Sequence, residues 1–167
     1  MKLLEPNLYR DDRGIFIESV KLGDLQEIGI TDNFVQENIS ISKQNVIRGL
    51  HFQIDPPQGK LITVLHGKAK FVEVDVRPNS KTFGKHVEFY LNDKNYYYLW
   101  VPPGFANGFA AFTDKLIVNY KVTNYWNPRS EGILLYNDKI LKIDWEIDNP
   151  ILSDRDKMGI PFKDISF

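Results

Sequence analysis

The feature that most constrains this chain is a strict alternation of apolar and polar residues in short runs. Between Val72 and Val76 every second residue is valine, and the residues between them are acidic. In residues 116–126, the longest such run, Val118, Tyr120 and Val122 share one face. A period of two is typical of strands that bury one face, so the sequence predicts a fold built from half-buried strands.

The strands are expected to be short and closely spaced, with turn residues between them. We expect them at residues 15–20, 34–41, 46–52, 60–65, 69–76, 86–91, 96–101 and 116–126, with one short helical segment at 22–28. This spacing favours a closed sandwich or barrel. At 167 residues the chain is long enough for one well-packed domain. We therefore predict a single all-β domain over residues 1–167. It is a double-stranded β-helix, or jelly roll, of eight or more strands with short peripheral helices, wide enough for a small ligand.

Charge and composition exclude several classes of function. The formal net charge is −1 and there are no cysteines, which argues against a nucleic-acid surface and excludes disulfides and thiolate metal sites. The segment before Pro6 is too short for a signal peptide, and no apolar run approaches the roughly 20 residues of a membrane span. We expect a cytoplasmic protein that contacts neither membrane nor nucleic acid.

Residues 45–60 concentrate the ionisable groups that an apolar run would not normally contain. Arg48 and His51 lie within the expected strand 46–52, and Lys60 opens the next strand after a Pro-Pro turn. Together they suit an anionic ligand such as a phosphate. Strict alternation would point Arg48 and His51 to opposite faces, but Gly49 between them could seat a bulge that turns both inward. A core histidine bonded to a backbone carbonyl is the alternative interpretation of His51.

Seven groups of residues together resemble the dTDP-4-dehydrorhamnose 3,5-epimerase family, a metal-independent cupin family. The most specific are Arg-Gly-Leu-His-Phe-Gln at 48–53 and Pro-Pro-Gly-Phe-Ala at 102–106. The matching segments follow the family order and cover nearly the whole chain: 12–19, 34–38, 48–53, 57–61, 100–106, 120–125, and 143–145 with 151–156. The resemblance implies an epimerase that inverts carbons 3 and 5 of a nucleotide-linked 4-keto-6-deoxyhexose, without a cofactor, for rhamnose biosynthesis.

The resemblance also implies roles for single residues. His51 would be the general base and Asp156 the carboxylate that orients it. Tyr120 would be the general acid on the opposite face, and Lys60 would stabilise the enolate oxygen. Each has a simpler interpretation taken alone: Tyr120 as a core residue, Asp156 as a solvated acid and Lys60 as a side chain that reaches solvent.

Substrate contacts are implied in the same way. Gln36, Asn38 and Arg48 correspond to residues that contact the diphosphate and the nucleoside. Arg13 and Glu18 correspond to a segment that reaches the ligand from the partner subunit of a homodimer. Two binding positions depart from the family pattern, and they correspond to residues near the diphosphate, the nucleobase and the sugar of the substrate. Asn107 stands where the family usually has histidine, and Trp126 where it usually has tyrosine.

The chemistry of such an epimerisation fits these residue types. Carbons 3 and 5 flank the C4 ketone, so each proton leaves through an enolate that a nearby cation must stabilise. Inversion then needs a proton from the other face, which a neutral tyrosine can donate. A carboxylate beside the histidine would hold the required tautomer.

Alternatives remain open from sequence. The chain could act at only one carbon, or on another nucleotide 4-keto sugar such as a heptose. It could also be a non-catalytic nucleotide-sugar-binding cupin. Metal-dependent cupins typically use a His-x-His pair, a glutamate and a later histidine; here Gln53 and Asn107 replace two of these, so we expect no metal.

Overall fold

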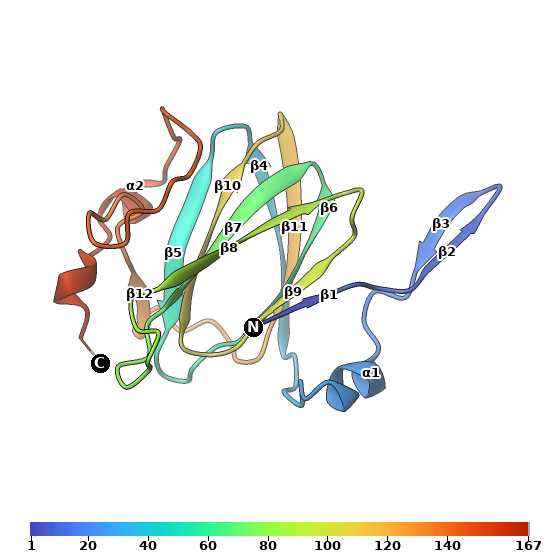
Figure 1. The fold of residues 1–167 in the computed structure, drawn as a ribbon, viewed down its shortest axis with the longest axis horizontal. Coiled ribbons are helices and arrows are strands. Elements are labelled where there is room, and N and C mark those ends of the chain that lie inside the picture. The colour runs from blue at the N-terminus through green and yellow to red at the C-terminus, as the bar shows by residue number, and fades with distance from the viewer. Residues whose placement is uncertain (167) are drawn as a thin grey trace.

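Two five-stranded antiparallel sheets pack face to face in a computed structural model that describes residues 1–166 (Figure 1). The first sheet has the order β1 (Lys2–Leu4), β9 (Tyr98–Val101), β6 (Lys60–His66), β11 (Lys115–Val122) and β4 (Gln36–Lys43). The second has the order β12 (Glu131–Ile133), β5 (Ile47–Gln53), β10 (Phe105–Ala111), β7 (Lys68–Asp75) and β8 (His86–Asn92). The predicted all-β jelly roll is confirmed.

Three shorter elements and one hairpin complete the architecture. Helix α1 (Leu22–Glu27) precedes β4, and helix α2 (Asp154–Lys157) and a 3-10 turn η1 (Phe162–Asp164) lie in the C-terminal segment. Strands β2 (Leu8–Asp11) and β3 (Gly14–Ile17) form a hairpin that projects away from the sandwich (Figure 1). No helix within residues 1–166 is long and apolar enough to cross a membrane.

The observed strands differ from the expected ones in number and in bounds. Strands β1, β2, β10 and β12 were not expected. Strand β11 ends at Val122 rather than Trp126, and β3 ends at Ile17 rather than Val20. Strand β10 was missed because its middle is small: Ala106, Gly108, Ala110 and Ala111 give no aliphatic alternation. Gly108 is needed there, because a Cβ would lie 3.0 Å from the Arg48 carbonyl oxygen and 3.0 Å from the Trp145 ring.

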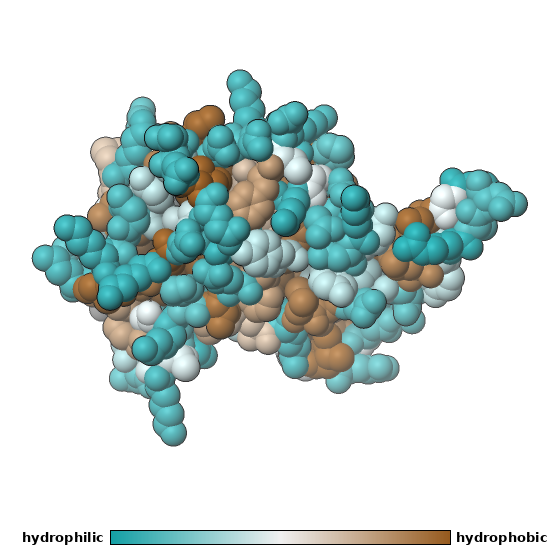
Figure 2. All heavy atoms as spheres, turned by 45° about the horizontal axis from the view of Figure 1, so that its top comes forward, coloured by the Kyte–Doolittle hydropathy of each residue, from teal (hydrophilic) through white to brown (hydrophobic). Residues whose placement is uncertain are grey.

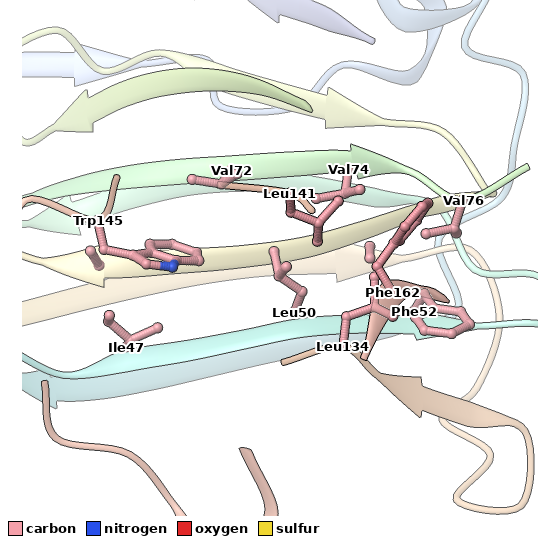
Figure 3. Close-up of a cluster of buried hydrophobic side chains, with 12 residues drawn as sticks. Ile47, Leu50, Phe52, Val72, Val74, Val76, Leu134, Leu141, Trp145 and Phe162 are labelled. Carbon is pink, nitrogen blue, oxygen red and sulfur yellow. The ribbon is translucent and has the colours of Figure 1, made fainter. Parts of the chain in front are cut away.

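Strands β7 and β10 in the second sheet are buried on both faces, because the C-terminal segment covers their outer side. Figure 3 shows Trp145, Leu141 and Phe162 from that segment packed against apolar side chains of the second sheet, among them Leu50 and Val72. Burial of this apolar surface is the main source of stability for such a layer.

The core between the sheets is separate from the one beneath the C-terminal segment. It includes Ile62 and Val64 of β6, Phe71 of β7 and Val118 of β11. Because strand side chains alternate, residues two positions from these also point between the sheets. The inner faces of β6, β7 and β11 therefore continue from the apolar core toward the polar cavity described below.

Candidate active site

A cavity of about 360 Å³ lies between the two sheets. Its lining is unusually polar for the interior of a sandwich, and its side chains come from both sheets and from two loops. The residues that line it are Gln36, Asn38, Ser40, Arg48, His51, Gln58, Lys60, Ile62, Phe71, Asn107, Phe109, Val118, Tyr120, Trp126 and Glu131. A cavity of this size with a few convergent polar groups is typical of small-molecule sites.

A β-bulge at Gly49 turns both Arg48 and His51 into the cavity. Asn107 of β10 is paired with His51 and Phe109 with Arg48, so three steps along β5 match two along β10. Gly49 has φ of 122°, and a Cβ on it would lie 2.5 Å from the Gly108 Cα. Only glycine fits both the positive φ and this close approach. The bulge predicted from the sequence is therefore confirmed.

His51 is bonded to Asp156, which comes from a helix 105 residues later in the chain. The His51 Nε2 lies 2.6 Å from the Asp156 Oδ1, and the Ser153 hydroxyl donates to Asp156 Oδ2 at 2.8 Å. Asp156 is only 4% exposed. Burial acts to raise the pKa of Asp156, but the hydrogen bonds from His51 and Ser153 outweigh it and hold that pKa below its usual value. An ionised carboxylate here fixes one ring nitrogen as the donor and leaves the other free to accept a proton.

Tyr120 enters the cavity from the opposite sheet. It lies on β11, paired with Asn38 on one side and Ile62 on the other. Burial raises the pKa of the Tyr120 hydroxyl above its ordinary value, and the nearby Arg48 charge only partly opposes this. The phenol therefore stays protonated at neutral pH and can donate a proton.

Lys60 stands at the start of β6 and lines the same cavity. Its ammonium donates a hydrogen bond to the His51 carbonyl oxygen at 3.3 Å. Burial lowers the pKa of Lys60, while the negative charges of Glu73 and Glu131 raise it. The cavity thus holds a histidine, a tyrosine and a lysine, each on a different strand.

The amide and guanidinium groups expected to bind a substrate also face the cavity. The Gln36 side-chain amide donates to Asn38 Oδ1 at 2.9 Å, and the Arg48 Nε donates to Ser42 Oγ at 3.0 Å. The Asn107 amide donates to Glu73 Oε1 at 2.5 Å. These bonds preorganise the polar wall before any ligand arrives.

Trp126 lies at the edge of the same cavity. Its indole N–H donates to Glu131 Oε2 at 3.1 Å, and the Arg155 guanidinium pairs with the same carboxylate. The ring is 51% exposed, so one face is available for stacking. Trp126 and Asn107 thus line the same cavity as His51 and Lys60.

Arg13 and Glu18 are not brought to this cavity. The Arg13 side chain is 90% exposed on the projecting hairpin and pairs with Asp11 at 2.5 Å. The Glu18 carboxylate accepts from the Tyr9 hydroxyl at 3.3 Å. Neither residue lines the cavity of its own chain, so a contact with ligand would have to be made in another copy.

Three cavity or near-cavity residues were missed by sequence reasoning: Gln58, Glu73 and Glu131. Glu73 lies in the alternating run of β7, where a charged residue between valines suggests a solvated face; instead it is 0% exposed. Glu131 follows a loop and opens a strand that was not expected. No short sequence pattern signalled Glu73, because its place beside Asn107 follows from the strand order and register of the second sheet.

The described part of the chain offers no obvious metal site. Among residues 1–166 there is no group of three or more His, Cys, Asp or Glu side chains placed to hold a metal ion. The donors around His51 are mostly amides, a lysine and an arginine, which are poor ligands for zinc, iron or copper.

Curated relatives with similar sequences carry one common name. The chain is 44% identical over 93% of its length to the dTDP-4-dehydrorhamnose 3,5-epimerase of Escherichia coli K12, of which it covers 85%. It is 43% identical over 95% of its length to the enzyme of that name from Neisseria gonorrhoeae, but it spans only about half of that protein, 49%.

Solved structures and a family model agree with these relatives. A dTDP-6-deoxy-D-glucose-3,5-epimerase from Legionella pneumophila Philadelphia 1, solved with dTDP-4-keto-L-rhamnose, superposes with a TM-score of 0.95 at 41% identity, covering 98% of this chain and 88% of that one. The model of the family described as dTDP-4-dehydrorhamnose 3,5-epimerase matches residues 1–164. The chain therefore belongs to the dTDP-4-dehydrorhamnose 3,5-epimerase family.

Proposed function

We propose that this chain converts dTDP-4-dehydro-6-deoxyglucose to dTDP-4-dehydrorhamnose by inverting carbons 3 and 5 of the sugar. The observation that carries the proposal is the arrangement of His51 and Tyr120, which face one cavity from opposite sheets. A base and an acid on opposite sides of a bound ring are what an inversion requires. Membership of the family and the similarity to a structure holding a dTDP-linked keto sugar support the choice of substrate.

In this mechanism His51 removes the proton next to the ketone. This C–H group is a weaker acid than imidazolium by on the order of ten pKa units. At 1.36 kcal/mol per unit, the proton transfer is uphill by roughly 14 kcal/mol. The base alone cannot supply this, so the enolate oxygen needs a fixed positive charge. Lys60 donates to the His51 carbonyl and lines the same cavity, so its ammonium is held close to the base. In a site with little water such a charge is worth far more than in bulk solvent.

Reprotonation takes place on the other face of the sugar. Tyr120 projects from β11 and its hydroxyl keeps its proton at neutral pH, since burial raises its pKa. Donation from Tyr120 to the planar enolate carbon gives the inverted centre, and solvent then restores the tyrosine proton. Because both carbons flank the same ketone, one base and one acid can serve twice when the ring turns between the two steps.

The nucleotide is bound by the polar wall around β4 and β5. Arg48 supplies a permanent positive charge for the diphosphate, and its Nε is already fixed by Ser42 at 3.0 Å. Gln36 and Asn38 supply amide donors and acceptors from the neighbouring strand. Trp126 offers an exposed aromatic face on which a base or sugar can stack.

The active form is a homodimer in this proposal. The outer face of β4 exposes Ile39 (61%) and Ile41 (62%), and the hairpin exposes Phe16 (67%). Figure 2 shows hydrophobic residues along the inner part of the projecting arm that the hairpin forms, with hydrophilic residues at its tip. Exposed apolar groups of this size favour burial in an interface. A partner's hairpin would bring a second Arg13 and Glu18 toward the open side of the cavity.

The first test is proton NMR of dTDP-4-dehydro-6-deoxyglucose incubated with the protein in D₂O. Deuterium should enter at both C3 and C5, and the rhamnose-configured product should accumulate. His51→Asn, which keeps the size of the side chain but removes the base, should abolish both. Exchange at a single carbon would show a mono-epimerase instead. No exchange by folded wild-type protein would exclude this substrate and favour a binding role.

A further inference from the structure

Glu73 is a buried acid whose position no step of the mechanism uses. It lies on β7 with 0% exposure, and its Oε2 is buried without a hydrogen-bond partner among the described residues. It is not among the residues that line the cavity. An ionisable group in such a place costs free energy unless neighbouring groups compensate it. Its surroundings therefore indicate what it does.

The register of the second sheet places Glu73 in line with the base. Asn107 of β10 is paired with His51 on one side and with Glu73 on the other, so the three residues form one row across the sheet. The Asn107 amide donates to Glu73 Oε1 at 2.5 Å. Asn107 thus stands between the base and the buried acid, and its amide orientation is set by Glu73.

Lys60 faces Glu73 from the other sheet. Ile62 and Phe71 both belong to the core between the sheets; Lys60 lies two residues before Ile62, and Glu73 lies two residues after Phe71, each on the same inner face. The positive charge of Lys60 acts to lower the pKa of the Glu73 carboxyl. In return, the negative charge of Glu73 acts to raise the pKa of Lys60, and does so more than the charge of Glu131.

Unused hydrogen-bonding capacity on the two side chains is complementary. The Lys60 ammonium has three donors, and its one bond is to the His51 carbonyl oxygen at 3.3 Å. The Glu73 Oε2 lacks a partner. On its other side Glu73 is paired with the apolar Val87 of β8, and the N-terminal amino group of Met1 also acts to lower the pKa of Glu73. Lys60 and Asn107 are therefore the polar side chains that Glu73 serves.

We propose that Glu73 is a positioning residue for the epimerisation: it supplies the counter-charge that keeps Lys60 protonated and fixes the amide of Asn107 at the cavity wall. The inference rests on the proposed function, because it gives Lys60 its role toward the enolate. Placing the carboxylate behind the wall, and not in it, stabilises the ammonium without presenting a second negative charge directly to the enolate or the diphosphate. Burial raises the pKa of Glu73 to about 8 and lowers that of Lys60. The counter-charge therefore acts mainly above about pH 8, where Glu73 is ionised and opposes the loss of the Lys60 proton.

The decisive variant is Glu73→Gln, read through the pH dependence of kcat/KM. The amide keeps the size of the side chain and the acceptor for Asn107 but removes the charge. Lys60 then loses its proton more easily, so the alkaline limb should move to lower pH by about one unit or more. At a fixed pH on that limb, kcat/KM should fall about tenfold. Tyr120 does not mask this limb, because burial raises its pKa above the usual value. Glu73→Asp restores the charge and should return the limb toward the wild-type position.

The matched control is Glu88→Gln. Glu88 pairs at 2.9 Å with Lys70, a buried lysine on the same strand as Glu73, and Lys70 keeps Glu146 as a second partner. This variant should leave the alkaline limb in place. A uniform loss of activity in Glu73→Gln at every pH, with the limb unmoved, would overturn the proposal, because it would show that Glu73 is needed only for packing.

A second readout does not depend on activity. The side-chain carboxyl carbon of Glu73, assigned through its backbone amide, is followed by NMR against pH in the wild type and in Lys60→Met. Removing the lysine charge should raise the Glu73 midpoint by about one unit or more. An unchanged midpoint would overturn the proposal, even where Glu73→Gln does not fold. If the midpoint shifts in Lys60→Met but the wild-type protein does not epimerise the dTDP sugar, the Lys60–Glu73 coupling is upheld and the proposed function is rejected.

Discussion

The His51 Nε2 lies 2.6 Å from the Asp156 Oδ1, and this one contact joins the inner face of β5 to the C-terminal segment that covers its outer side. The base of the proposed reaction thus depends on the same segment that covers the second sheet. Asp156 is in turn fixed by the Ser153 hydroxyl. This hydroxyl accepts a hydrogen bond from the Asp156 backbone N–H at 3.0 Å and donates one to the Asp156 carboxylate at 2.8 Å.

Asp156→Asn should lower kcat by on the order of 10³-fold with little effect on KM, because an amide in this place cannot hold the imidazole in the basic tautomer or stabilise the imidazolium. The measurement is steady-state epimerisation of the dTDP sugar. Ser153→Ala is the comparison: it removes one bond to Asp156 but keeps the charge, and it should cost tenfold or less. Equal losses in the two variants would contradict a role for the charge.

Tyr120→Phe should separate proton exchange from inversion. His51 still removes the proton and can return a deuteron from solvent to the same face, whereas the donor on the opposite face is lost. In D₂O the recovered substrate should therefore gain deuterium with retained configuration, while formation of the epimer falls by about 10²-fold or more. NMR of the recovered sugar distinguishes the two. Product formation at the wild-type rate would show that another group donates the proton.

The sequence predicted the polar site better than it predicted the strand that supports it. Gly49 between Arg48 and His51 indicated a bulge, because only a bulge turns both side chains to one face, and the structure has it. That inference succeeds because it depends on local geometry alone. Gln36 and Asn38 were expected at the site only from the family resemblance, and on β4 they line the cavity while Ile39 and Ile41 on the other face are exposed.

The failures concern faces whose burial depends on distant parts of the chain. In β7 the valines that suggest an inner face pack instead against the C-terminal segment, and Glu73 points between the sheets. A period of two gives the two faces but not which one meets the cavity. The row that links His51, Asn107 and Glu73 needs the order of strands in the sheet, which no short pattern contains.

Gly49→Ala should destabilise the protein by about 3 kcal/mol or more, because the residue combines φ of 122° with a Cβ position 2.5 Å from the Gly108 Cα. Urea unfolding measures the loss. Gly23→Ala is the matched control: it lies in helix α1 with no heavy atom within 4 Å of its Cβ position, so it should be neutral or stabilise by up to about 1 kcal/mol. Similar losses at both positions would contradict the bulge argument.

Asp138 should make the fold sensitive to acid. Burial acts to raise the pKa of Asp138, but the backbone N–H groups of Phe162, Leu141 and Ile140 hold it below the ordinary 3.8. A group with a lowered pKa stabilises the fold at pH values above its unfolded pKa, and this contribution is lost as the pH falls through the folded value. The free energy of unfolding should therefore fall below about pH 4.

Asp138→Asn tests this linkage by urea unfolding at several pH values. At pH 7 the variant should be less stable than the wild type by about 1–3 kcal/mol, since the buried N–H groups lose a charged acceptor. The difference should shrink steadily as the pH is lowered below 4. A difference that stays constant with pH would show that packing, and not the charge of Asp138, is responsible.

The projecting hairpin leads to the last prediction, which concerns assembly. Light scattering should give the mass of a dimer for the wild type, and Ile41→Glu should give a monomer, because Ile41 is 62% exposed on the outer face of β4 and a charge there cannot be buried in an interface. Met158→Glu is the control, since Met158 is 76% exposed beside α2 and its substitution should leave the dimer intact.

Arg13→Ala should keep the dimer but raise KM about tenfold, because a charged contact to the ligand contributes roughly 1.5–3 kcal/mol. A wild type that is monomeric at working concentration, or an Arg13→Ala variant with unchanged KM, would show that the hairpin does not complete the partner's cavity.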